Sequence, residues 1–119
     1  MATVANITAG FYTGAAFSLT FSFTEDVAGW AFSWKLQKDT GAVVLTKTMA
    51  DGITIIGTFN ADPAQNTQRV VVEIEPDDTT ALKGGQYQHE LKRIDADAQY
   101  VLAGGYAQLT KAIHAAVAA

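Results

Sequence analysis

The chain has 119 residues and a mass of 12.6 kDa, which is the size of a single domain. Hydrophobic residues make up 49% of the chain and charged residues 17%, a composition that supports a buried core and excludes a disordered tail. The net charge of −4 disfavours a nucleic-acid partner, and the absence of cysteine excludes disulfides, cysteine-ligated zinc and thiol nucleophiles.

The sequence shows no targeting or membrane-spanning segment. Met1–Val4 lacks the basic start of a secretory signal, and polar residues interrupt every apolar stretch before the roughly 18 residues that a membrane helix requires. We therefore expect no membrane partner, and we expect the chain to be made and assembled in a cytoplasm.

Two runs in the first third of the chain alternate apolar and other side chains with a period of two. Phe17–Phe23 places apolar residues at every second position with Ser or Thr between them, and Trp30–Leu36 repeats this pattern. Successive side chains of a strand leave opposite faces, whereas a helix would scatter these residues around its circumference. Both runs therefore predict strands with one buried face.

Turn-forming residues separate the strands that follow. Asp39-Thr40-Gly41 predicts a three-residue hairpin loop with Gly41 in the left-handed backbone region. Asp51-Gly52 predicts a second turn between two β-rich segments. Arg69–Glu75 predicts another strand, which Pro76 ends because proline cannot donate to the ladder.

The last third predicts a short helix and a hairpin. One or two helical turns are expected near residues 77–83, with an Asp or Thr at the start and Gly84 after the end. Tyr87, His89 and Leu91 alternate in the next strand, and residues 95–98 predict its hairpin loop. Gly104-Gly105 predicts a bulge in the return strand.

Together these elements predict an all-β protein of one domain. About seven or eight strands with frequent turns and almost no helix are typical of an antiparallel β-sandwich or a small barrel. The two consecutive bulky alternations favour a sandwich whose core is filled from both inner faces.

The sequence offers no combination of residues for nucleophilic catalysis. Ser18, Ser22 and Ser33 are expected on the outward side of strands, outside any nucleophile elbow. His89 is expected to be a packed or interface histidine with a hydrogen bond, and His114 lies in the Ala-rich end of the chain. Glu90 would lie on the opposite face of its strand from His89. We therefore predict no catalytic residues and a protein that is not an enzyme.

Metal and cofactor sites are likewise not expected. Asp77 and Asp78 are predicted to cap the short helix, and Asp95 and Asp97 to form a turn, because neither pair has the ligand spacing of a calcium loop. The glycines in Thr8–Gly14 lack the Lys-Ser/Thr of a phosphate-binding loop. The prediction is no metal and no cofactor.

Four aromatic residues leave an alternative open. Exposed on one surface, they would form a platform for carbohydrate, and buried they would form the core. Their alternation with small or polar residues favours the core, so a carbohydrate-binding surface module remains the alternative function. The four residues are Trp30, Phe32, Trp34 and Tyr87.

Residues 82–93 and 100–105 contain a distinctive sequence pattern: leucine, glycine and tyrosine, then Glu90-Leu91-x-Arg93, a hairpin, leucine and glycine. This sequence pattern resembles that of small immunoglobulin-like domains in tailed bacteriophages, such as the N-terminal domain of baseplate upper proteins. Residues 17–23 and 30–36 look like the first sheet of the same domain, so the resemblance covers residues 15–110. It implies an immunoglobulin-like antiparallel sandwich and a structural role in the virion.

In structural terms, this sequence pattern predicts a tyrosine corner. Gly84-Gly85 lets the chain cross from one sheet to the other, and Tyr87 is expected to place its ring in the core and its hydroxyl on a backbone group near the crossing. The disulfide and paired tryptophan of antibody domains are not present in antibody form.

The predicted organisation is an N-terminal arm at residues 1–14, a sandwich at 15–111 and an apolar C-terminal arm at 112–119. Arms of this kind commonly lie on a neighbouring subunit. Baseplate upper proteins carry further regions, so the expected role is a stand-alone virion subunit, either a tail or baseplate accessory protein or a capsid decoration protein. Its expected partners are other virion proteins and further copies of itself.

Overall fold

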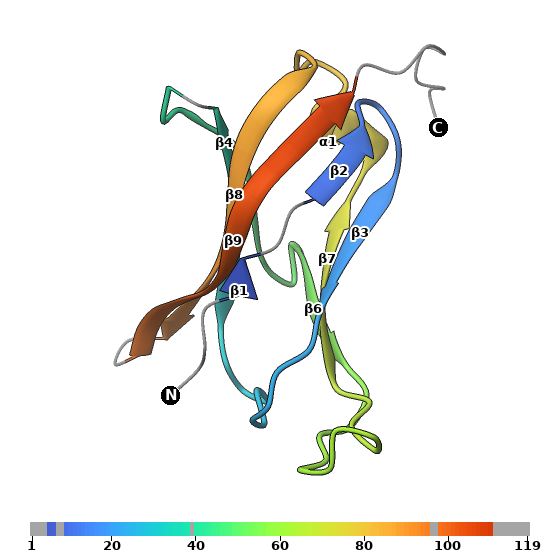
Figure 1. Cartoon of the computed structure of the whole chain (residues 1–119), viewed down its shortest axis with the longest axis vertical. Coiled ribbons are helices and arrows are strands. Elements are labelled where there is room, and N and C mark those ends of the chain that lie inside the picture. The colour runs from blue at the N-terminus through green and yellow to red at the C-terminus, as the bar shows by residue number, and fades with distance from the viewer. Residues whose placement is uncertain (1–4, 7–8, 39, 96–97, 111–119) are drawn as a thin grey trace.

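The computed structural model describes residues 5–6, 9–38, 40–95 and 98–110. Within them the chain forms nine strands and one short helix (Figure 1). In chain order these are β1 Ala5–Asn6, β2 Ala9–Tyr12, β3 Phe17–Phe21, β4 Phe32–Lys38, β5 Val43–Met49, β6 Gly52–Ile56, β7 Arg69–Ile74, α1 Pro76–Thr79, β8 Gly85–Asp95 and β9 Ala98–Thr110.

The strands form two layers joined through one short contact. The hydrogen-bonded order is β1-β9-β8-β4-β5-β6-β7-β3, and β2 also pairs with β9. Strands β9, β8, β4 and β5 form an antiparallel layer, and β6, β7 and β3 form the other. The path bends between the layers where β5 and β6 pair in parallel over two residue pairs. The predicted antiparallel, immunoglobulin-like β-sandwich is confirmed.

The core lies between the layers and is built by the predicted alternations. Trp34 at the centre of β4 is completely buried, and inward residues of β7 and β8 belong to the same buried cluster. Bulky residues every second position on facing layers interdigitate and remove apolar area from water at about 25 cal/mol per Å². The largest of these buried side chains are Phe32, Trp34, Leu36, Ile53, Val70, Val72, Ile74, Leu91, Leu102 and Leu109.

The predicted turns are present, and one of them connects the two layers. Gly41 closes the hairpin between β4 and β5 with a φ of 92°, as expected. At the second turn Ala50 and Gly52 have φ values of 62° and 100°, and the chain passes from β5 directly into the other layer. A side chain at Gly52 would meet Lys47 Cδ at 2.6 Å, so this crossing requires glycine for space as well as for backbone conformation.

The predicted short helix is α1, but it covers only Pro76–Thr79 and not the expected 77–83, and Thr80 rather than Gly84 follows its end. Pro76 ends β7 and starts the helix, as its missing N–H allows. The residue at the cap position is Glu75, whose backbone N–H donates to Asp78 Oδ2 at 2.7 Å. Among the described residues no helix has the length and apolar character needed to cross a bilayer.

The bulge prediction at Gly104-Gly105 is wrong by two to three residues. The register of β8 and β9 shifts between Leu91 and Lys92, whose partners are Ala103 and Val101, so Leu102 is the extra residue. The bulge turns both Leu102 and Ala103 into the core. Gly104 has a different role, because a Cβ there would lie 3.2 Å from the carbonyl oxygen of His89.

Part of the predicted N-terminal arm pairs with the chain's own sheet. Ala5–Asn6 and Ala9–Tyr12 run parallel to β9 along its outer edge. These pairings supply main-chain hydrogen bonds without a strong side-chain pattern, so alternation alone did not reveal them. Residues 1–4 and the C-terminal arm 112–119, with His114, lie outside the described residues.

Candidate functional site

Tyr87 forms the predicted tyrosine corner. Its ring is buried in the core, and its hydroxyl donates to the carbonyl oxygen of Lys83 at 2.8 Å. This bond fixes the segment between α1 and β8 against the strand that it enters. The role of Tyr87 is therefore structural.

The Tyr87→Phe variant is expected to lose about 1 kcal/mol of unfolding free energy, because the Lys83 carbonyl loses one partly buried hydrogen bond. Urea denaturation followed by circular dichroism measures this loss. Tyr106→Phe is the matched control: Tyr106 is 52% exposed, so its stability should change by less than about 0.5 kcal/mol. Equal stability of Tyr87→Phe and the wild type would contradict a stabilising tyrosine corner.

His89 is a packed histidine with a hydrogen bond, as predicted. It is 3% exposed, and its Nδ1 accepts from Trp34 Nε1 at 3.2 Å. Glu90 is exposed on the opposite side of β8, so it cannot orient His89 for catalysis. The two rings instead link the neighbouring strands β4 and β8 on the core side of their layer, where they are diagonal neighbours because Leu36, two residues after Trp34, pairs with His89.

The aromatic residues considered as a carbohydrate platform do not share an exposed surface. Phe32 and Trp34 are completely buried, and Tyr87 is 5% exposed. Trp30 is half-buried, and the guanidinium of Arg93 lies over its ring at 3.8 Å. The preferred interpretation of these residues as core is confirmed for three of them, and the fourth is covered on one face.

Arg93 also organises the end of the β8–β9 hairpin. Its Nε donates to Asp95 Oδ2 at 2.8 Å, and Asp95 Oδ1 accepts the backbone N–H of Ala31. These bonds to Ala31 and then to Arg93 lower the pKa of the Asp95 carboxyl below its ordinary value. Asp97, its predicted partner in the turn, lies outside the described residues.

This geometry predicts a pH dependence of stability. Because the pKa of Asp95 is lower in the folded state, its contribution is complete above the ordinary carboxyl pKa of 3.8 and is lost as the pH falls below that value. Asp95→Asn should therefore lower stability at neutral pH and flatten its decline in acid, measured as unfolding midpoints between pH 7 and pH 2. Asp77→Asn, at an exposed position of α1, is the control and should keep the wild-type slope. A wild-type slope in Asp95→Asn would contradict the assignment.

The remaining acidic and hydroxyl candidates are structural or isolated. Asp78 accepts Lys47 Nζ at 2.7 Å as well as the backbone of Glu75, and Asp77 is exposed beside it. Ser18 and Ser22 are exposed as predicted. Ser33 is only 9% exposed, contrary to expectation, because it lies on a central strand between Thr48 and Lys92.

No group of three or more His, Asp or Glu side chains is placed to hold a metal ion within the part of the chain that the structure describes. Inside the sandwich, Trp34 and His89 are hydrogen-bonded to each other, and the Tyr87 hydroxyl is bonded to a backbone carbonyl.

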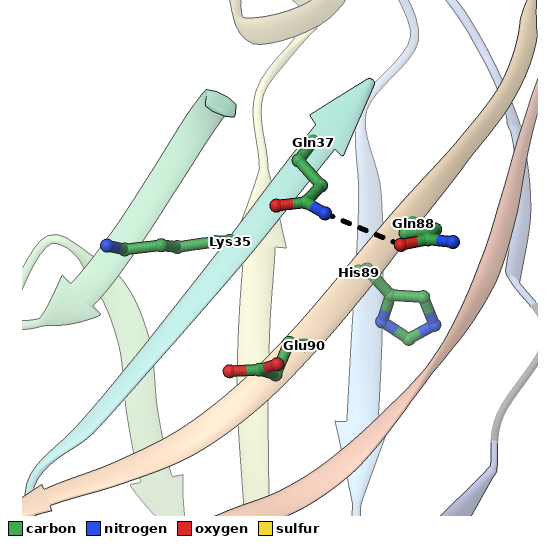
Figure 2. A pocket seen from close by; sticks show the side chains of 5 residues that line it. All are labelled: Lys35, Gln37, Gln88, His89 and Glu90. Carbon is green, nitrogen blue, oxygen red and sulfur yellow. Dashed lines mark hydrogen bonds between the residues drawn. The ribbon is translucent and has the colours of Figure 1, made fainter. Parts of the chain in front are cut away.

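The outward side of β4, β8 and β9 carries a polar surface with one exposed aromatic ring, which we call the outer face. Gln88 is its centre: it lies between Gln37 of β4 and Tyr106 of β9, and Gln37 Nε2 donates to Gln88 Oε1 at 3.4 Å (Figure 2). The members of the outer face are Lys35, Gln37, Gln86, Gln88, Glu90, Tyr106 and Gln108.

A shallow hollow of about 110 Å³ lies on the outer face between β4 and β8 (Figure 2). Lys35 and Glu90 pair across the two strands and supply opposite charges to its lining. Sequence reasoning did not identify this surface, although the polar positions between Tyr87, His89 and Leu91 carried the signal. The amides and the tyrosine of the outer face offer adaptable hydrogen bonds to another protein.

Comparisons with known proteins define no family for this chain. No family model matches the sequence, and no curated protein matches it. Among solved structures, the chain is similar to the crystal structure of CopC from Methylosinus trichosporium OB3b. The sequence identity is 12% and the TM-score is 0.38, over 89% of this chain and 90% of the other. A likeness of this size transfers no function.

Proposed function

We propose that this chain is a non-enzymatic structural subunit of a tailed-phage virion that acts through protein–protein contacts. In the virion it would be either an accessory protein of the tail or baseplate or a decoration protein of the capsid. Its partners would be other virion proteins, and the subunit would be assembled into the particle in the host cytoplasm.

The observation that carries the proposal is the division between the two sides of the β8 strand. Inward residues such as Tyr87 and His89 are bonded within the fold, whereas outward Gln86, Gln88 and Glu90 are exposed beside Tyr106. Interfaces are enriched in tyrosine and use amides for adaptable hydrogen bonding. The choice of a phage particle rests on the resemblance of residues 82–105 to small virion domains.

The carbohydrate-binding alternative has less support. It requires an exposed aromatic platform, and Trp34 is completely buried while Arg93 covers one face of Trp30. A single exposed ring at Tyr106 is a smaller platform than the alternative requires.

The proposal is tested by adding purified chain to particles assembled without it and measuring how much sediments with them. We expect saturable binding that Tyr106→Ala weakens at least tenfold, the effect of removing one interface anchor. Ile56→Ala is a matched control, because Ile56 is also 52% exposed but lies on β6, away from the outer face. It should bind like the wild type.

Two results would overturn the proposal. The first is wild-type chain that stays in the supernatant at every particle concentration. The second is chain that binds purified cell-surface polysaccharide and not particles, which would establish the alternative.

A further inference from the structure

Strand β3 is an edge strand, at one end of the hydrogen-bonded strand order. Phe17–Phe21 pairs with β7 along its whole length, and β3 is the last strand in the hydrogen-bonded order of the described residues. Figure 1 shows β3 at the margin of the molecule beside β7. Its outer edge therefore presents main-chain groups that can pair with a further strand.

This edge lacks the features that commonly prevent strands from pairing between molecules. Residues 17–23 contain no charged residue and no proline. The opposite end of the path differs, because it is formed by β1 and β2, which have two and four residues. Very short edge strands are protected by their length, so β3 is the more accessible of the two ends.

The apolar side of residues 17–23, which comprise β3 and the two residues after it, is incompletely covered at both ends. Phe17 and Phe23 are only partly buried, whereas Val70 and Val72 on the neighbouring β7 are completely buried. A hollow of about 360 Å³ between β2 and β3 is lined in part by Ala16 and Phe17. An additional strand at this edge would cover apolar area that the single chain leaves accessible to water.

We propose that the occupant of this edge is a second copy of the chain, paired antiparallel through β3 about a two-fold axis at Thr20. The two three-stranded layers then form one continuous sheet. Thr20 lies opposite the partner's Thr20, and the outward Ser18 lies opposite the partner's Ser22. The inward Phe17 lies opposite the partner's Phe23, so polar meets polar and apolar meets apolar.

The lack of charge in residues 17–23 is compatible with a second copy as the occupant. A two-fold pairing places only the residue on the axis opposite its own equivalent, so a charge at position 20 would meet a like charge. Residues 17–23 carry none, which makes the strand compatible with itself. The inference rests on the proposed function, because an assembling subunit needs contacts of this kind, but self-association and particle binding are measured separately and can fail separately.

The chain has no cysteine, so a single introduced cysteine reports the pairing without background. Under mild oxidation Thr20→Cys should form a disulfide-linked dimer at a rate at least tenfold above Glu73→Cys. Glu73 is the matched control, because it is exposed on the adjacent strand of the same layer, one strand in from the edge. Directly opposite strand residues bring their Cβ atoms within disulfide distance, whereas residues one strand away do not. Equal cross-linking of the two variants would overturn the proposal.

A second experiment measures self-association of the unmodified chain. Sedimentation equilibrium should show a species of twice 12.6 kDa, and Thr20→Lys should raise the dissociation constant at least tenfold, because two lysines would then lie opposite each other. Thr20→Gln should associate within a few-fold of wild type. Circular dichroism of Thr20→Lys verifies that the exposed substitution leaves the fold intact.

Three outcomes would contradict the β3 pairing. A chain that remains monomeric up to about 1 mM has no affinity of this kind. A dimer that persists unchanged in Thr20→Lys uses another surface. A dimer that is lost when the chain ends at Thr110, but not in Thr20→Lys, has residues 111–119 as the paired segment.

Discussion

Asp78→Ala is expected to destabilise the protein by about 3 kcal/mol, because it leaves the buried ammonium of Lys47 without its partner. Lys47 points inward from β5, is 8% exposed, and lies 2.7 Å from Asp78 Oδ2. The same oxygen accepts the backbone N–H of Glu75 at the start of α1. One substitution therefore removes an ion pair and a helix-capping bond.

Lys47→Met should behave differently from Asp78→Ala. Methionine keeps an apolar stem beside the Gly52 crossing and removes the charge, so the expected loss is below about 1 kcal/mol. Asp77→Ala, the exposed neighbour, should change stability by less than about 0.5 kcal/mol. Urea denaturation of the three variants measures this order. Equal losses for Asp78→Ala and Lys47→Met would show that the buried charge does not determine the effect.

Trp34→Phe is the second substitution with a large expected effect, a loss of about 3 kcal/mol. The smaller ring leaves a cavity in a fully buried position, and His89 Nδ1 loses the donor that lies 3.2 Å away. Trp30→Phe is the matched control. Trp30 is half-buried and packs against Phe32 and Arg93, so its replacement should cost about 1 kcal/mol.

Both variants retain a single tryptophan, so fluorescence reports each site directly. Trp30→Phe, which retains Trp34, should show the blue-shifted emission of a buried indole. Trp34→Phe, which retains Trp30, should show emission shifted to the red. A red-shifted spectrum in Trp30→Phe would place Trp34 in contact with water and would contradict the sandwich core.

The strands with one strong apolar face were predictable because alternation reports the face of a strand directly. Phe17–Phe23 and Trp30–Leu36 carry bulky residues at every inward position, and β3 and β4 follow them closely. Tyr87 was also predictable, since the glycines before it and its place in the strand define a tyrosine corner. Both features are encoded locally, because the residues that define each of them lie within one short segment of the sequence.

The features that sequence reasoning missed depend on distant pairings. Lysine in a strand usually faces solvent, and the partner that allows Lys47 to be buried is Asp78 on another element. The pairing of β1 and β2 with β9 rests on backbone bonds, which side-chain alternation does not report. The bulge lies at Leu102 because two consecutive residues face the core there, and the glycine pair gave a misleading signal.

The outer face was missed for another reason. Its residues come from three strands that are brought together only by the register of β4, β8 and β9, and each strand alone shows ordinary exposed polar positions. Gln37, Gln88 and Tyr106 become one surface only when the pairing is known. The resemblance to virion domains supplied the hypothesis of assembly, and the register supplies the surface on which to test it.

The most direct test of the structural-subunit assignment is the copy number of this chain in gradient-purified particles from the strain that encodes it, measured by quantitative mass spectrometry against a major particle protein. A structural subunit should be present at a fixed ratio that does not change with further purification. A chain that is absent from the particles, or whose ratio falls at every purification step while the free protein accumulates, would contradict the assignment.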